Sequence, residues 1–138
     1  MDRVFLDANV LVSAALKPKS RIAGLWELPD ARLLASPHIV AEARRNVGDP
    51  EAASRLEALI EALAVLPSEP AEFVIAEAPD LPAKDRPVLL GAIASGANFL
   101  LTGDMSHFGA CFGCTFAGVT VLLPGEYLRR RDGAAKPY

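Results

Sequence analysis

The sequence predicts an α/β protein: a three-layer α/β/α sandwich built around a central parallel sheet of four to five strands. Short apolar runs alternate along the chain with segments of helical periodicity, which is typical of βαβ units. The first run, residues 4–6, has no alternating polar positions, as expected for a strand that is covered on both faces. Prolines and glycines mark many boundaries between the two kinds of segment.

Each element has its own signal. Strands are expected where apolar runs end at a turn or a polar residue: residues 4–6, 32–35, 64–66, 98–101 and 119–123. Helices are expected where capping residues or prolines precede spaced apolar residues: 10–16, 20–26, 37–47, 50–63, 71–78, 84–95 and a terminal helix from 124. The segment 84–95 is expected to be the longest helix.

The composition indicates one ordinary globular domain. The chain has 138 residues, of which 51% are hydrophobic and 22% charged. We therefore expect a single domain over residues 1–131 and a short polar tail over 132–138. Two cysteines are too few for a disulfide framework, and no apolar segment is long enough to cross a membrane. Because the N-terminus has no targeting pattern, we expect a soluble, cytoplasmic protein.

The charge balance gives no overall reason for nucleic-acid binding, since the formal net charge is −3. A nucleic-acid partner would need a local basic patch. The candidates are Lys17, Lys19, Arg21, Arg44 and Arg45, and the run 129–131 on the terminal helix. For any one of these residues, a solvated surface is the simpler account.

Two acids follow predicted strands. Asp7 directly ends the first apolar run, and Asp104 lies just beyond the run at 98–101. The carboxyl ends of parallel strands share one edge of the sheet, where open α/β sheets bind their ligands, so these two carboxylates can meet there. Helix capping is an alternative role for Asp7, because Asp is a favoured N-cap residue.

Two further acids lie on predicted helices. Asp85 precedes Val88 and Leu89 by three and four positions, which places it on the apolar face of its helix. A buried carboxylate is costly unless it has a partner. An acid in the first turn of a helix is also favoured by the helix dipole, which is the structural alternative for Asp85. Glu42 borders the apolar stripe of the helix that begins at Pro37.

Four carboxylates at one sheet edge would repel one another unless a cation compensated their charge. A site made only of oxygen ligands suits Mg²⁺ or Mn²⁺ better than Zn²⁺ or Cu²⁺. Such ions activate water and stabilise the leaving oxygen when a phosphodiester is displaced in line. The expected chemistry is hydrolysis without a covalent enzyme intermediate.

These motifs resemble those of the PIN-domain nucleases in order and spacing. The resemblance spans nearly the whole chain and rests on residues 5–14, the helix from 36 that carries Glu42, residues 84–89 and residues 100–104. It implies a PIN-like fold and RNA cleavage dependent on Mg²⁺ or Mn²⁺. In this family the metal-binding, catalytic acids match Asp7, Glu42, Asp85 and Asp104, and the positions that support the site match Asn9 and Thr102.

Many compact bacterial members of the family are VapC-like toxins, which are usually dimeric and are held inactive by an antitoxin. The resemblance therefore implies an RNA substrate, a small antitoxin partner and a homodimer. The family often has a further acid soon after the position of Asp104, whereas Met105, Ser106 and His107 follow here. This departure leaves the number of bound ions open.

Other functions also stay open. A PIN ribonuclease of RNA processing or decay would use the same carboxylates, and a PIN-like binding module would keep the acids without productive metal binding. A phosphoryl-transfer enzyme could use Asp7 as its nucleophile. That last function is disfavoured because Asn9 replaces the second acid of an Asp-x-Asp motif.

Four remaining residues are of types that often form sites, but their spacing does not match a known site. Cys111 and Cys114, even with His107 upstream, do not supply the four ligands of a structural zinc site, and we interpret them as loop residues. His38 lies in the first turn of its helix without an evident partner, and we interpret it as structural or exposed.

Overall fold

The computed structural model describes residues 1–71, 85–104 and 108–135. Its centre is a six-stranded sheet with the order β3-β2-β1-β4-β6-β5. The strands are β1 (Asp2–Leu6), β2 (Ala31–Ala35), β3 (Ala64–Val65), β4 (Phe99–Leu101), β5 (Thr115–Phe116) and β6 (Val119–Leu122). Neighbouring strands pair in parallel, except for the antiparallel pair of β5 and β6.

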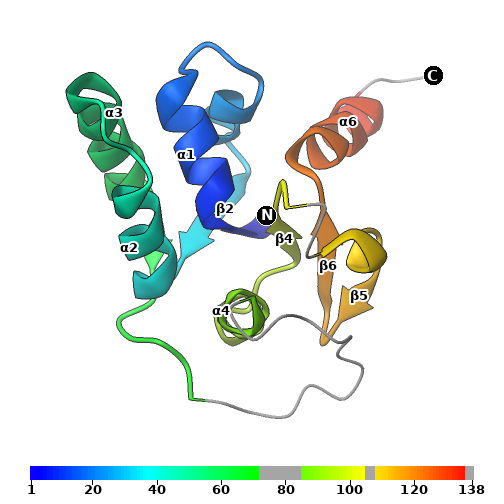
Figure 1. The fold of residues 1–138 in the computed structure, drawn as a ribbon. Helices are drawn as coiled ribbons and strands as arrows, with labels where there is room; N and C mark the ends of the chain where they lie inside the picture. The colour runs from blue at the N-terminus through cyan, green and yellow to red at the C-terminus, as the bar shows by residue number, and fades with distance from the viewer. Residues whose placement is uncertain (72–84, 105–107, 136–138) are drawn as a thin grey trace.

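Helices cover both faces of the sheet. They are α1 (Ala8–Leu16), η1 (Ile22–Glu27), α2 (Pro37–Arg45), α3 (Pro50–Glu61), α4 (Arg86–Ala94), η2 (Gly109–Cys111) and α6 (Pro124–Ala135). Figure 1 shows α4 on one side of the sheet and α1, α3 and α6 on the other. The predicted three-layer α/β/α sandwich is therefore confirmed.

The sheet differs from the prediction at one edge. The five parallel strands lie where the apolar runs predicted them, but β5 adds an antiparallel strand and makes the sheet mixed. The β5–β6 turn has positive φ at Ala117 and Gly118, 50° and 84°, which matches the tight hairpin turns that suit twisted strands. A strand of only two residues leaves no alternation in the sequence, so the apolar pattern did not reveal it.

Two predicted helix boundaries need correction. Among the described residues, α4 is not the longest helix: it has 9 residues and begins at Arg86, whereas α3 and α6 have 12 each. Pro87 explains the late start, because proline fits only the first turn of a helix. At the C-terminus, α6 continues to Ala135 rather than ending before the expected tail, and Asp132 on this last stretch pairs with Arg21 (Oδ2 to Nη2, 3.0 Å).

Two smaller differences concern the loops. The helix expected near 20–26 is the 3₁₀ helix η1. The helix predicted at 71–78 lies outside the described residues, apart from Ala71. In the described part of the chain, every helix is too short or too polar to cross a membrane.

The central strand and α4 pack unusually closely, which fixes the start of α4 against the sheet. Val4, Phe5 and Leu6 are fully buried. A Cβ atom added to Gly91 would lie 2.8 Å from Cζ of Phe5, so a larger residue there would force the Phe5 ring or the helix to move. This contact holds Asp85, at the beginning of α4, close to the sheet.

The order of the strands reverses between β1 and β4. The strand that follows β1 lies on one side of it, and the strands that follow β4, namely β5 and β6, lie on the other side. In open α/β sheets such a reversal leaves a crevice outside the carboxyl ends of the two strands, which is the usual place for a ligand. Asp7 follows β1 at this point, and Thr102 follows β4.

Candidate active site

A cavity of about 710 Å³ opens at this carboxyl edge. All four acids that the sequence singled out line it: Asp7, Glu42, Asp85 and Asp104. They come from four separate segments, namely the end of β1, the middle of α2, the start of α4 and the loop after β4. The fold thus brings the four carboxylates together, and we call this space the acid cavity.

Asp7 is buried and firmly held. Only 6% of the residue is exposed. Its Oδ1 accepts a hydrogen bond from the backbone N–H of Ala8 at 2.7 Å, and its Oδ2 accepts one from the hydroxyl of Thr102 at 2.8 Å. The two roles considered for Asp7 are therefore compatible, because one oxygen caps α1 while the residue also lines the acid cavity.

Asn9 and Thr102 tie the end of β1 to the end of β4. The Nδ2 group of Asn9 lies 3.3 Å from both Asp7 Oδ2 and Thr102 Oγ1, and its Oδ1 accepts from the N–H of Gly103 at 2.8 Å. Thr102 is fully buried, and its Oγ1 accepts from the N–H of Asp104 at 3.1 Å. This network orients Asp7 and the backbone of Asp104; its role in catalysis stays a prediction.

Asp85 occupies the N-cap position of α4 rather than its first turn. The residue is 7% exposed, and its carboxylate does not cap the backbone of the helix. Its backbone carbonyl instead accepts from the N–H of Val88 at 3.1 Å. A capping hydrogen bond therefore does not explain this acid. The dipole of α4 favours a negative charge at its N-terminus, and the side chain also forms part of the wall of the acid cavity.

The acids influence one another electrostatically. Burial raises the pKa of Asp7 above its ordinary value of 3.8 and is the largest effect. The hydrogen bonds from Thr102 and Ala8 lower this pKa, while the negative charges of Glu42 and Asp85 raise it further. A cation in the acid cavity would relieve both the burial cost and the repulsion.

The donor set fits a hard divalent cation. Within the described residues, no three His, Cys, Asp or Glu side chains are already arranged to hold one ion together. Mg²⁺ does not require such a cage, because it usually keeps several waters and binds through one or two carboxylates. The Glu42 side chain is 41% exposed, so it has room to change rotamer toward an ion.

His38 is a residue that the sequence interpretation missed. It lines the acid cavity, and its Nε2 lies 3.8 Å from Oε2 of Glu42 one turn along α2. Glu42 is thus a neighbour that the sequence pattern had not made evident for His38. The spacing of four residues on one helix was the available signal, because side chains at that spacing are neighbours.

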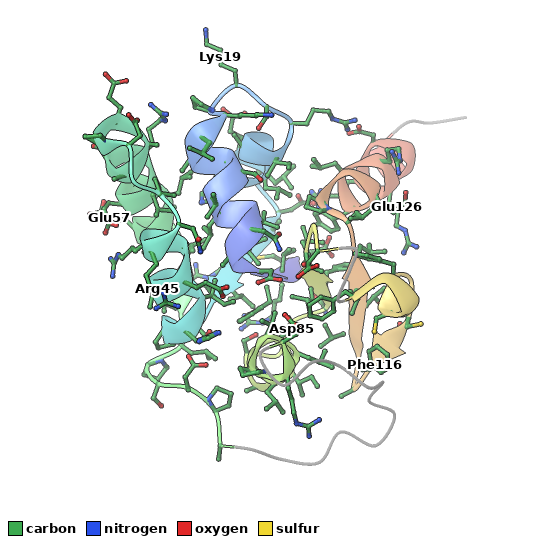
Figure 2. The ribbon with its side chains drawn as sticks, in the orientation of Figure 1. Lys19, Arg45, Glu57, Asp85, Phe116 and Glu126 are labelled. Atoms are coloured by element: carbon green, nitrogen blue, oxygen red, sulfur yellow. The ribbon has the colours of Figure 1, made fainter. Side chains whose placement is uncertain are left out.

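Only one of the five basic candidates reaches the acid cavity. Arg45 lines it, whereas Arg44 points to α3 and bonds both carboxylate oxygens of Glu57 (Nε at 3.0 Å, Nη2 at 2.7 Å). Lys17, Lys19 and Arg21 follow the far end of α1, and Figure 2 shows Lys19 at the opposite end of that helix from Asp85. Their role in RNA binding stays a prediction.

The remaining candidates lie elsewhere. Cys111 is buried, Cys114 is exposed, and neither forms a disulfide. Burial raises the pKa of the Cys111 thiol, which makes it a poor nucleophile. In the run 129–131, Arg129 lines a second cavity described below, while Arg131 bonds Asp2 and Asp30 at the other edge of the sheet. Residues 105–107, which replace the family's further acid, lie outside the described residues.

Comparisons with known proteins agree with this geometry. The family profile of the PIN domain matches residues 3–106. The structure of VapBC2 from Rickettsia felis bound to a DNA fragment from their promoter is similar, with a TM-score of 0.61 and 16% identity over 86% of this chain and 96% of that chain.

A second similar structure is VapC20 of Mycobacterium tuberculosis, a sarcin-ricin loop cleaving toxin. Here the TM-score is 0.52 and the identity 17%, over 75% of this chain and 92% of that chain. Identities this low establish a common fold only. A search of curated protein sequences finds no match.

Proposed function

Because this chain belongs to the PIN-domain family, we propose that it is a metal-dependent endoribonuclease and the toxin of a toxin–antitoxin pair. One observation carries the proposal: four carboxylates from separate segments line one cavity at the point where the strand order reverses. Structural acids are normally dispersed or paired, whereas a group of acids in a cleft that includes one with a raised pKa, here Asp7, is typical of catalytic sites.

Asp7, Glu42, Asp85 and Asp104 would hold Mg²⁺ or Mn²⁺. When bound, the ion supplies an activated water and compensates the charge that develops on the scissile phosphate. The protein's own contribution is to fix Asp7 in place before substrate arrives, through the hydrogen bonds from Thr102 and Ala8. Asn9 extends this support to the loop that carries Asp104.

The same cavity offers a contact for the RNA phosphate. Arg45 is the sole Lys or Arg among the described residues that line the acid cavity, which His38 and Asn46 also line. A guanidinium at this place can bind a phosphate oxygen while the acids face the ion. In the reaction, a water oxygen bonds to phosphorus, one ester P–O bond breaks, and the released oxygen gains a proton.

The toxin part of the proposal rests on the fold shared with VapC20, described as a sarcin-ricin loop cleaving toxin, and with the VapBC2 complex. It includes a small antitoxin that blocks the acid cavity, a homodimer and a cytoplasmic location. The product of a small gene adjacent to this one should bind the protein and abolish its activity. Light scattering of the purified protein measures whether it is a dimer.

A second candidate is a PIN-like binding module without catalysis. The observation that favours it is that, among the described side chains, no three potential ligands already converge on one point. A ribonuclease of RNA processing or decay would have the same acid cavity as a toxin, and the absence of a neutralising partner would distinguish it.

The test is cleavage of a mixture of structured RNAs by the purified protein in Mg²⁺, in Mn²⁺ and in EDTA. Asp104→Asn is prepared in parallel, because it removes one charge while keeping the shape of the side chain. We expect cutting that needs the ion and that disappears in the variant.

A folded protein that binds the ion but leaves this mixture intact would indicate a toxin selective for an RNA not in the mixture. A protein that neither binds the ion nor cuts would contradict the nuclease and support the binding module.

A further inference from the structure

We propose that a second cavity, between α1 and α6, is the subsite for the nucleotide adjacent to the cleaved phosphodiester. The inference rests on the proposed function of the acid cavity. The second cavity has a volume of about 320 Å³ and is lined by residues of α1, η1, the loop after β4 and the first turns of α6. We call it the α1–α6 cavity.

The two cavities adjoin each other. Asn9 and Ser13, one turn apart on α1, line both of them. Asn9 is fixed by its bonds to Asp7, Thr102 and Gly103, so the wall between the cavities is rigid. A strand whose phosphate lies at the acids would therefore continue over this part of α1 into the α1–α6 cavity.

The walls of the α1–α6 cavity suit an unstacked base. Val10, Ile22, Leu123 and Pro124 give it apolar sides. Proteins that extrude a base hold it between aromatic or apolar side chains, and splayed RNA bases also stack on Arg guanidinium planes, which Arg129 can supply here. The volume lies at the lower limit for small-ligand sites, about 300–1,000 Å³. That size favours a single nucleotide over a folded segment of a protein partner.

A positively charged side chain, that of Arg129, lines the α1–α6 cavity. Arg129 pairs with Glu126 (Nη2 to Oε2, 2.5 Å), but the Arg129 side chain is 65% exposed. Exposed ion pairs contribute little free energy, so this guanidinium can exchange the carboxylate for a phosphate. Figure 2 shows Glu126 on α6, across the molecule from Arg45 on α2. Arg45 lines the acid cavity and Arg129 lines the α1–α6 cavity, so each cavity has an arginine for a phosphate contact.

Two matched pairs of variants test the subsite. Gly125 lines the α1–α6 cavity, and an added Cβ there meets no atom within 4 Å, so Gly125→Trp adds a bulky side chain at the cavity without a clash at its Cβ. Gly48 has the same freedom and lines neither cavity, so Gly48→Trp is the control. Likewise Arg129→Gln is compared with Arg130→Gln, because Arg130 also contacts Glu126 (Nε to Oε1, 3.6 Å) but does not line the cavity.

The measurement is the affinity for a fluorescent, mixed-sequence ten-nucleotide single-stranded RNA in Mg²⁺, with all variants built on Asp104→Asn to prevent cutting. We expect Gly125→Trp to weaken binding about tenfold or more, which is the order of the contribution of one bound base, and Gly48→Trp to leave it unchanged. Arg129→Gln should reduce the slope of log affinity against log salt by about 0.7, the value for one single-strand phosphate contact, and Arg130→Gln should not.

Equal affinities for the two tryptophan variants, or equal salt slopes for the two glutamine variants, would overturn the subsite and leave the cavity to another occupant such as a protein partner. Failure of the parent to bind this RNA would overturn it as well. The proposed function can fail independently of the subsite. If the variants change RNA binding as expected but the wild-type protein never cuts RNA, the nuclease proposal is contradicted and the RNA-binding subsite remains.

Discussion

Acids lie at both ends of the central sheet, but the groups that contact them differ between the two ends. At the amino end, Asp2 accepts hydrogen bonds from the hydroxyl of Tyr127 at 2.7 Å and from Nη1 of Arg131 at 3.0 Å. Arg131 also bonds Asp30 and lies over the ring of Tyr127, 5.7 Å from its centroid. One cation thus compensates two carboxylates, and this end of the sheet is a structural joint that fastens α6.

At the carboxyl end, Asp7 receives its hydrogen bonds from neutral groups, and further acids line the same cavity. The negative charges of Glu42 and Asp85 raise its pKa instead of stabilising its charge. The contrast between Asp2 and Asp7 suggests a way to separate structural acids from acids proposed to bind a cation. Asp2 is compensated by an arginine of the protein, whereas the hydrogen bonds that Asp7 accepts within the described part of the chain come from uncharged groups, which suits the proposed cation.

The largest expected effect is the loss of RNA cleavage caused by the substitution Asp7→Asn. Supporting groups around metal ligands typically contribute about 10–100-fold to affinity or activity, so loss of a ligand charge should cost more than about 100-fold. Asp2→Asn is the control, because it removes an acid of the amino end and should keep full activity while lowering stability. RNA cleavage rates in Mg²⁺ measure both variants. Similar loss of activity in the two would show that the acids are not functionally distinct.

Thr102→Val should have the next largest effect. The substitution keeps the shape of the side chain but removes the hydroxyl that bonds Asp7 Oδ2 at 2.8 Å and accepts from the Asp104 N–H. We expect a loss of roughly 10–100-fold in cleavage rate, as is usual for residues that orient metal ligands. Thr115→Val, which breaks an exposed hydroxyl pair with Thr120, is the matched control and should cleave normally.

Arg131→Gln should change stability and not activity. It leaves Asp2 and Asp30 without their shared cation, which we expect to cost roughly 1–3 kcal/mol and to lower Tm by about 3–10 °C. Arg21→Gln breaks the exposed pair with Asp132 and should cost less than about 1 kcal/mol. Thermal unfolding gives both values, and a cleavage defect in Arg131→Gln would contradict the separation of the two ends.

The smallest expected effect is a pH dependence of stability without metal. Because the pKa of Asp7 is raised in the folded state, the folded protein binds this proton more tightly than the unfolded chain. Its contribution to stability therefore falls as pH rises from the ordinary value of 3.8 through the raised pKa, and stays low above it.

Asn does not titrate, so Asp7→Asn lacks this loss of stability. As pH rises over this range, the free energy of unfolding of the variant should therefore increase relative to that of the wild type. Urea unfolding in EDTA from about pH 4 to 8 measures the difference between the two proteins. A difference that does not vary with pH would show that Asp7 titrates alike in the folded and unfolded states.

The acids were predictable because their signals are local. Asp7 and Asp104 were identified from the ends of apolar strands, and Asp85 from its spacing to Val88 and Leu89. These patterns depend on regular strand and helix geometry, which short segments already encode. The same reasoning located the five parallel strands.

The features that were not predicted depend on how distant segments pack. Which basic residue faces the acids is decided by the position of α2, since adjacent Arg44 and Arg45 point to different neighbours. The joint between Asp2 and Arg131 links positions 129 residues apart, and no local pattern marks it. The α1–α6 cavity likewise exists only once α6 has docked.

The most direct test of the central claim is the change in Tm on adding Mg²⁺ to the wild type, Asp7→Asn and Asp2→Asn. A ligand at a hundredfold excess over its Kd stabilises a protein by about 2.7 kcal/mol. We predict that Mg²⁺ raises the Tm of the wild type and of Asp2→Asn by the same amount and leaves that of Asp7→Asn unchanged. Equal shifts in all three proteins, or none in the wild type at millimolar Mg²⁺, would contradict a metal site at the carboxyl edge.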